Sequence, residues 1–130
     1  MGKHIGFTGL WLWVALMAMV VACSPSVKVP EPVEGPSLEL SAIDSLMWRQ
    51  PDSALAQLQR FVVSPEADSL DEFNGHYCQV LIAELLYKNF YKQSNRKELL
   101  KAVRYFDSID DGFLAARAHY INGVGFYERD

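Results

Sequence analysis

This 130-residue chain contains two cysteines and three histidines, the residue types that most often act as nucleophiles, bases or metal ligands. His76 and Cys78 stand two positions apart in a helical pattern, where side chains do not share a face, and no other histidine or cysteine is near them. Three aspartates before Gly112 lack the alternate-residue spacing of a calcium loop. No serine can be grouped with a histidine and an aspartate as a nucleophile. The sequence therefore predicts no metal, no cofactor and no enzymatic activity.

The other cysteine, Cys23, ends a segment that is typical of a secretory signal peptide. Residues 10–22 are thirteen consecutive apolar residues, which suits a signal peptide and is short of the ~20 that a membrane span needs. The last four positions, Val20, Val21, Ala22 and Cys23, resemble the lipobox of bacterial lipoproteins. This resemblance implies attachment of lipid to the Cys23 thiol, cleavage after Ala22 and acylation of the freed amine. The alternatives are an ordinary signal peptide with an incidental cysteine, or a membrane span.

Residues 24–37 contain four prolines, which block helix formation and remove backbone donors. Such a segment is expected to act as an extended spacer that reaches up to ~40 Å at ~3.1 Å per residue. Ser24 stands where sorted lipoproteins carry an aspartate for inner-membrane retention, so the resemblance implies the outer membrane and leaves the leaflet open. The predicted organisation is a signal peptide over residues 1–22, a lipid-attached tether over 23–37 and a folded domain over 38–130.

Composition places the folded part among ordinary globular domains. The chain is 50% hydrophobic and 22% charged, so it can bury a core. Its formal net charge is −4, without the clustered lysines and arginines on which nucleic-acid binding depends. We therefore expect no nucleic-acid partner.

The folded part is predicted to be all-α, because no useful stretch alternates with a period of two and apolar residues recur at helical spacing. Helices are expected to begin at Leu38, Pro51, Ser69, Asn95 and Phe113. Ser69 with Glu72 and Asn95 with Glu98 match capping boxes, and Ser41 with Asp44 would form another if the first helix starts late. The third helix should run to about residue 91, and its all-round apolar second half should be covered on more than one side.

Small residues at two equivalent helix positions point to repeats. After Ala54 and Ala102, large apolar residues follow at positions +1, +4 and +7, which resembles the second helix of a tetratricopeptide repeat. Ala42 lies twelve residues before Ala54, and Gly123 with Phe126 resembles the small and aromatic positions of the repeat's first helix. The resemblance implies a tetratricopeptide-like α-solenoid of antiparallel helical hairpins, with these five residues at packing positions. The two alanines are 48 residues apart, against a period of about 34, so the middle repeat must be stretched.

The last expected helix, residues 113–127, has no following mate, although hairpins of this kind hide one helix against the other. We therefore expect the last hairpin to be incomplete and the chain to be a fragment of a longer array. The alternative is that the exposed face of this helix docks on a partner or on a second copy.

Lipobox, proline-rich tether and helical hairpins together resemble tetratricopeptide-repeat lipoproteins of Gram-negative bacteria. This resemblance implies a membrane-tethered, non-enzymatic scaffold of the cell envelope that binds a protein or peptide. The alternatives are a glycan- or nutrient-binding outer-membrane lipoprotein and the sensor part of an envelope signalling system.

Overall fold

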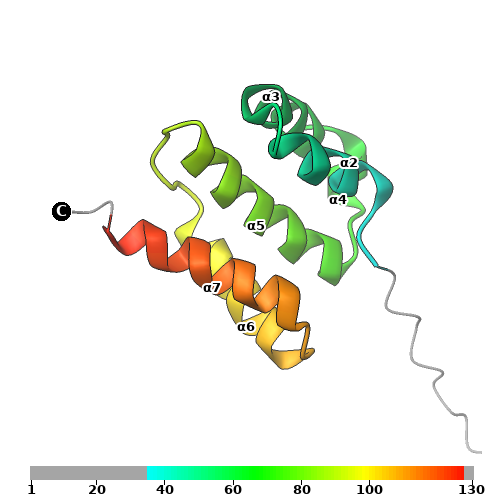
Figure 1. Cartoon of the computed structure of the whole chain (residues 1–130). Helices are drawn as coiled ribbons and strands as arrows, with labels where there is room; N and C mark the ends of the chain where they lie inside the picture. The colour runs from blue at the N-terminus through cyan, green and yellow to red at the C-terminus, as the bar shows by residue number, and fades with distance from the viewer. Residues whose placement is uncertain (1–34, 128–130) are drawn as a thin grey trace, which may run out of the picture. The chain divides into compact units, whose positions relative to one another are not determined.

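The computed structural model describes residues 35–127, which form helices and contain no strand (Figure 1). The all-α prediction is confirmed for this part of the chain. None of these helices combines the length and the apolar character that crossing a bilayer needs. The predicted signal peptide, the lipobox with Cys23 and residues 24–34 of the tether lie outside the described residues. The helices are α2 (Leu38–Met47), α3 (Pro51–Val62), α4 (Pro65–Asp68), α5 (Glu72–Lys88), α6 (Arg96–Ser108) and α7 (Gly112–Tyr127).

Helix α2 begins at Leu38 as predicted, whereas α5 differs from the prediction in its capping residue. Ser37 caps α2, because its hydroxyl accepts the Leu40 amide at 3.2 Å, so the helix begins before Ser41. Asp71, not Ser69, caps α5 and accepts the amide of Asn74 at 2.7 Å. The unpredicted helix α4 explains this shift, since Ser69 ends that helix and donates its hydroxyl to the carbonyl of Glu66.

Asn95 precedes α6 as predicted, but its side chain does not cap the helix. The Asn95 amide group instead donates to the main-chain and side-chain oxygens of Gln79 in α5, both at 2.9 Å. Asn95 was predicted to cap α6, but its side chain instead joins the start of α6 to α5.

Helix α5 ends at Lys88, three residues before its expected end. The amide of Tyr91 donates to the carbonyl of Leu86 at 2.8 Å, and Phe90 between them has a φ of 63°. This hydrogen bond and the left-handed residue form the usual C-terminal helix motif, in which glycine normally takes the left-handed position. Phe90 has no such freedom, and its ring is 98% exposed.

Three helices, α2, α5 and α7, run in the same direction in one layer (Figure 1). The first ends of α2 and α5 meet where the Ser37 amide donates to Asn74 at 2.7 Å. Their other ends meet where the Lys88 ammonium lies 4.2 Å from the Trp48 ring centroid. Helix α3 packs against α2 and α5, and α6 packs against α5 and α7. Helix α5 is thus covered from several sides, as its apolar second half predicted.

The predicted packing positions fall in different environments. Ala54 and Ala102 are completely buried, which allows close approach of their helices. Ala42 is exposed, because the buried face of α2 is formed by Leu40, Ile43 and Met47 instead. The expectation of a packed small residue at Ala42 is therefore wrong.

The tight glycine of α7 is Gly125 and not Gly123. A Cβ added at Gly123 would meet no atom within 4 Å, whereas one at Gly125 would collide with the Gln93 side chain. Gln93 and Arg96 hold this end of α7 by donating to the carbonyls of Ile121 and Gly125 at 2.8 and 3.1 Å. Phe126 is 55% exposed, and the Arg96 guanidinium lies 4.2 Å from its ring centroid.

The hydrophobic core is one cluster, whose buried members all lie between Leu40 and Ile121. A chain of residues 24–130 therefore contains every residue of the core.

Candidate functional site

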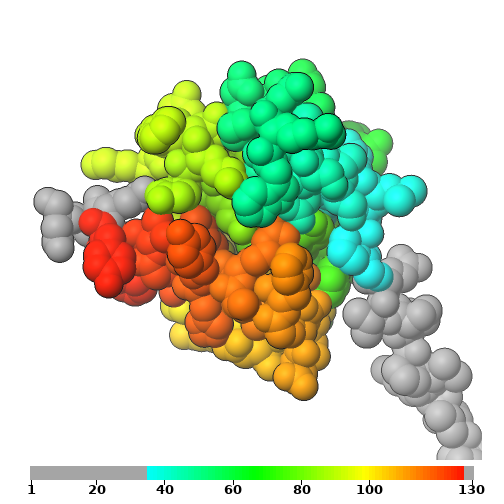
Figure 2. Space-filling model, viewed as in Figure 1, coloured from blue at the N-terminus to red at the C-terminus, as the bar shows by residue number. Residues whose placement is uncertain are grey.

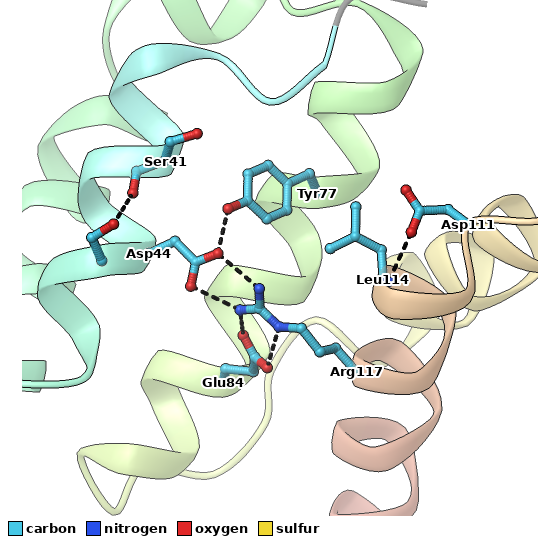
Figure 3. A network of polar contacts seen from close by, with 8 residues as sticks. Ser41, Asp44, Tyr77, Glu84, Asp111, Leu114 and Arg117 are labelled. Carbon is cyan, nitrogen blue, oxygen red and sulfur yellow. Dashed lines mark hydrogen bonds and ion pairs between the residues drawn. The ribbon is translucent and has the colours of Figure 1, made fainter.

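Arg117 of α7 binds two carboxylates that come from the two other helices of the layer (Figure 3). Its Nη1 and Nη2 atoms lie 2.7 and 2.9 Å from the two carboxylate oxygens of Asp44 in α2. Its Nε and Nη2 atoms lie 3.1 and 2.5 Å from those of Glu84 in α5. One planar guanidinium thus makes two bidentate contacts, a geometry that a lysine cannot provide.

The cluster is mostly buried, and its charges do not cancel. The side chains of Arg117, Asp44 and Glu84 are only 13%, 16% and 11% exposed, and one cation faces two anions. Tyr77 of α5 adds a neutral donor by giving its hydroxyl proton to Asp44. Each oxygen of the two carboxylates therefore accepts at least one hydrogen bond. The cluster has a formal charge of −1, and it forms the floor of the two hollows described below.

The pKa values of this cluster follow from burial and from these contacts. Burial of Tyr77 and its hydrogen bond to Asp44 raise the pKa of its phenol well above the usual range. Burial alone would lower the pKa of Arg117, but the hydrogen bonds and charges of Glu84 and Asp44 outweigh burial and raise it. Arg117 is therefore charged at any physiological pH.

The sequence analysis missed this cluster and considered Asp44 only for a capping box. A usable signal was present. Glu84 is the only Asp, Glu, Lys or Arg between Glu72 and Lys88, and Arg117 is the only one in α7. A single charge inside an apolar helix needs a partner, because an unpaired buried charge is strongly unfavourable.

Two hollows lie above this floor, between α2 and α7, and they share Phe113 and Arg117. We call the two hollows together the α2–α7 groove. Figure 2 shows the seam between the surfaces of α2 and α7. The larger hollow, of about 500 Å³, is lined by Trp48, Glu84, Tyr87, Lys88, Phe113, Ala116, Arg117, Tyr120 and Ile121. The smaller, of about 310 Å³, is lined by Pro36, Ser41, Asp44, Ser45, Phe73, Tyr77, Asp111, Phe113, Leu114 and Arg117.

Aromatic side chains dominate the accessible walls of the larger hollow. Phe113 is 72% exposed, and Trp48 and Tyr120 are each 66% exposed. Exposed aromatic rings beside a concave floor are typical of binding surfaces, because they offer large apolar area with few rotatable bonds. The groove can therefore hold an extended peptide or a flat ligand by stacking and apolar contact.

His76, Cys78 and His119 lie apart from the groove. The His76 ring stacks on Tyr105 with centroids 4.5 Å apart, and burial lowers the pKa of His76. Cys78 is a buried free thiol, and burial raises its pKa to about 11. His119 pairs with Asp107 at 2.9 Å on the exposed side of α6 and α7. Among residues 35–127, no group of three potential ligands could hold a metal ion.

The predicted packing residues Ala42, Ala54, Ala102, Gly123 and Phe126 do not line the groove either. The groove is therefore a feature that only the tertiary structure reveals. No protein-family model, curated protein or solved structure matches this chain.

Replacing Arg117 by methionine should lower the free energy of unfolding by about 3–5 kcal/mol, because two buried carboxylates lose their common cation. Urea unfolding of residues 24–130 at neutral pH measures this loss. Arg104→Met, at an exposed arginine of α6, is the matched control and should change little. An equal loss in both variants would contradict the role given to the cluster.

Stability should also fall in alkali because of Cys78. Its native pKa of about 11 lies above the ordinary value of 9.0, so between these values the unfolded chain loses a proton that the native chain keeps. The free energy of unfolding therefore decreases as pH rises through this window. Unfolding measured between about pH 8 and 9, at least one unit below the ordinary tyrosine pKa of 10.0, reports mainly on the thiol. Cys78→Ala should flatten the pH dependence, and an unchanged slope would contradict the assignment.

Proposed function

We propose that this chain is a membrane-tethered, non-enzymatic interaction scaffold of the cell envelope, in which tetratricopeptide-like helical hairpins present the α2–α7 groove to a protein or peptide. The exposed aromatic walls of the groove are the observation that carries this proposal. Within the domain these rings stabilise little, because most of their surface stays in water.

The arrangement of the helices supports the solenoid part of the proposal. Helices α2 and α5 are each followed by a helix that packs on them, and α3 and α6 also pack on the next helix of the layer, α5 and α7 respectively. The buried Ala54 and Ala102 stand on α3 and α6, where the repeat resemblance asks for small residues. Helices stacked in this way leave one face of a layer open for ligands.

The sequence of the N-terminus supports the tethered part. The four residues from Val20 to Cys23 follow an apolar run and precede a proline-rich segment, which is the order that a lipidated, surface-tethered domain requires. Two or more acyl chains on Cys23 would anchor the chain stably, where a single chain binds only reversibly. The outer membrane is the proposed site, since Ser24 is not an aspartate.

One alternative has an observation of its own. Trp48, Tyr87, Phe113 and Tyr120 lie around one hollow, and aromatic rings of this kind also stack on sugars. A glycan- or nutrient-binding lipoprotein is therefore the second candidate. A sensor part in an envelope signalling system would use the same groove for a protein ligand.

Changing Cys23 to serine should release the protein from membranes or leave an uncleaved precursor, because serine has no thiol to take the lipid. Fractionation of the producing cells, with the mass of the native polypeptide, measures this. Cys78→Ser is the matched control and should stay in the membrane fraction, since that thiol is buried. A Cys23→Ser chain that still carries lipid would contradict the lipobox interpretation.

The binding role can be tested by placing a photo-crosslinking amino acid at Tyr120 in the groove and, as a control, at Val63, which is 83% exposed and outside both hollows. We expect a defined protein product from position 120 only, which Phe113→Ser should abolish. Equal crosslinking from both positions would contradict the groove as a binding site. Binding of soluble oligosaccharides by residues 24–130, sensitive to Phe113→Ser and without a protein product, would favour the glycan alternative.

A further inference from the structure

The turn after α5 exposes a phenylalanine in an unfavourable backbone conformation. Phe90 has a φ of 63°, in the left-handed region where a side chain is disfavoured, and its ring is 98% exposed. The domain thus bears conformational strain at this position and gains no burial in return. Strain of this kind, held by the surrounding structure, is often associated with function.

The neighbours of Phe90 are aromatic or basic. A shallow hollow of about 640 Å³ is lined by Tyr87, Lys88, Phe90, Tyr91 and Lys92, and no acidic side chain is among them. We call these five residues the α5 end. Tyr91 is 59% and Tyr87 40% exposed, so their hydroxyls can stay in a polar layer. The chain as a whole is acidic, with a formal charge of −4, so this basic surface is a local exception.

We propose that the α5 end docks on the anionic surface of a lipid bilayer. Phe90 enters the boundary of the acyl chains, the two tyrosines lie at the level of the headgroups, and the lysines contact lipid phosphates. Aromatic residues with polar tips are enriched at this depth, and lysines near a surface are attracted by anionic lipids. Few residues are involved, so the contact is weak and reversible.

The shape of the α5 end favours a membrane over an acidic peptide. The hollow at the α5 end is shallow, and Phe90, which lines it, is almost completely exposed, so its ring lacks the enclosing walls that the α2–α7 groove offers a peptide. A bilayer accepts a protruding ring without a matching pocket. A lipid anchor would strengthen such a contact by raising its effective concentration. The reach of ~40 Å predicted for residues 24–37 exceeds the ~25 Å length of α5. The α5 end, which lies far from residue 37, can therefore reach the bilayer that holds the anchor.

The proposal does not depend on lipidation, so it is tested on residues 24–130, which contain the whole core and lack Cys23. Circular dichroism and cooperative thermal unfolding first establish that this chain is folded. Co-sedimentation then compares vesicles of phosphatidylcholine mixed with phosphatidylglycerol against vesicles of phosphatidylcholine alone. We expect binding to the mixed vesicles only, with loss at high salt.

Phe90→Gly should weaken binding to the mixed vesicles at least about tenfold, because the inserted ring is lost. The same change should raise the melting temperature, since glycine accepts the left-handed conformation; unfolding of the variant therefore cannot explain the lost binding. Lys92→Glu should weaken binding about fivefold or more. Val63→Ser, at an exposed valine after α3, is the matched control and should bind as the unchanged chain does.

Three results would overturn the proposal. These are the absence of binding to mixed vesicles, equal binding to neutral vesicles, and full binding by Phe90→Gly. Binding of a polyglutamate peptide without binding to vesicles would also overturn it and would assign the α5 end to an acidic protein partner. None of these outcomes affects the anchor or the groove, because the test uses neither Cys23 nor Phe113.

Discussion

The α2–α7 groove depends on the contacts of the Arg117 guanidinium with Asp44 and Glu84. The guanidinium links α7 to α2 and α5 through four contacts of 2.5 to 3.1 Å, in a position where all three side chains are largely removed from water. Burying charges is unfavourable unless geometry and hydrogen bonds compensate. The planar fork of arginine provides this compensation for only one relative position of the three helices. The four contacts form together only while α2, α5 and α7 keep these relative positions.

Two surfaces result from this arrangement, and they are of different character. The α2–α7 groove is concave and aromatic, with a floor of mutually bonded charges. The α5 end is a shallow, aromatic and basic hollow, and it shares Tyr87 and Lys88 with the larger hollow of the groove. A ligand in the groove and a surface at the α5 end would therefore touch the same two side chains.

Periodicity predicted the helical class, most helix starts and the central position of α5, because local spacing decides which face of a helix is apolar. The helix caps were less predictable. The sequence around Ser69 matches a cap for α5, but Ser69 instead ends the short helix α4 and donates its hydroxyl to the carbonyl of Glu66. The groove could not be predicted, since it depends on Asp44 and Arg117, which are 73 positions apart in the chain. Gly125 shows the same limit, because its tight neighbour Gln93 comes from another segment.

That separation of 73 positions also has a kinetic consequence. Contacts within neighbouring helices close short loops and form early, whereas a contact across most of the domain can form only after the intervening helices are in place. We therefore expect the pairing of Asp44 with Arg117 to form late in folding. Interactions absent from the transition state act mainly on the unfolding rate. The cluster is thus expected to slow the unfolding of the α2–α7 groove far more than it speeds its formation.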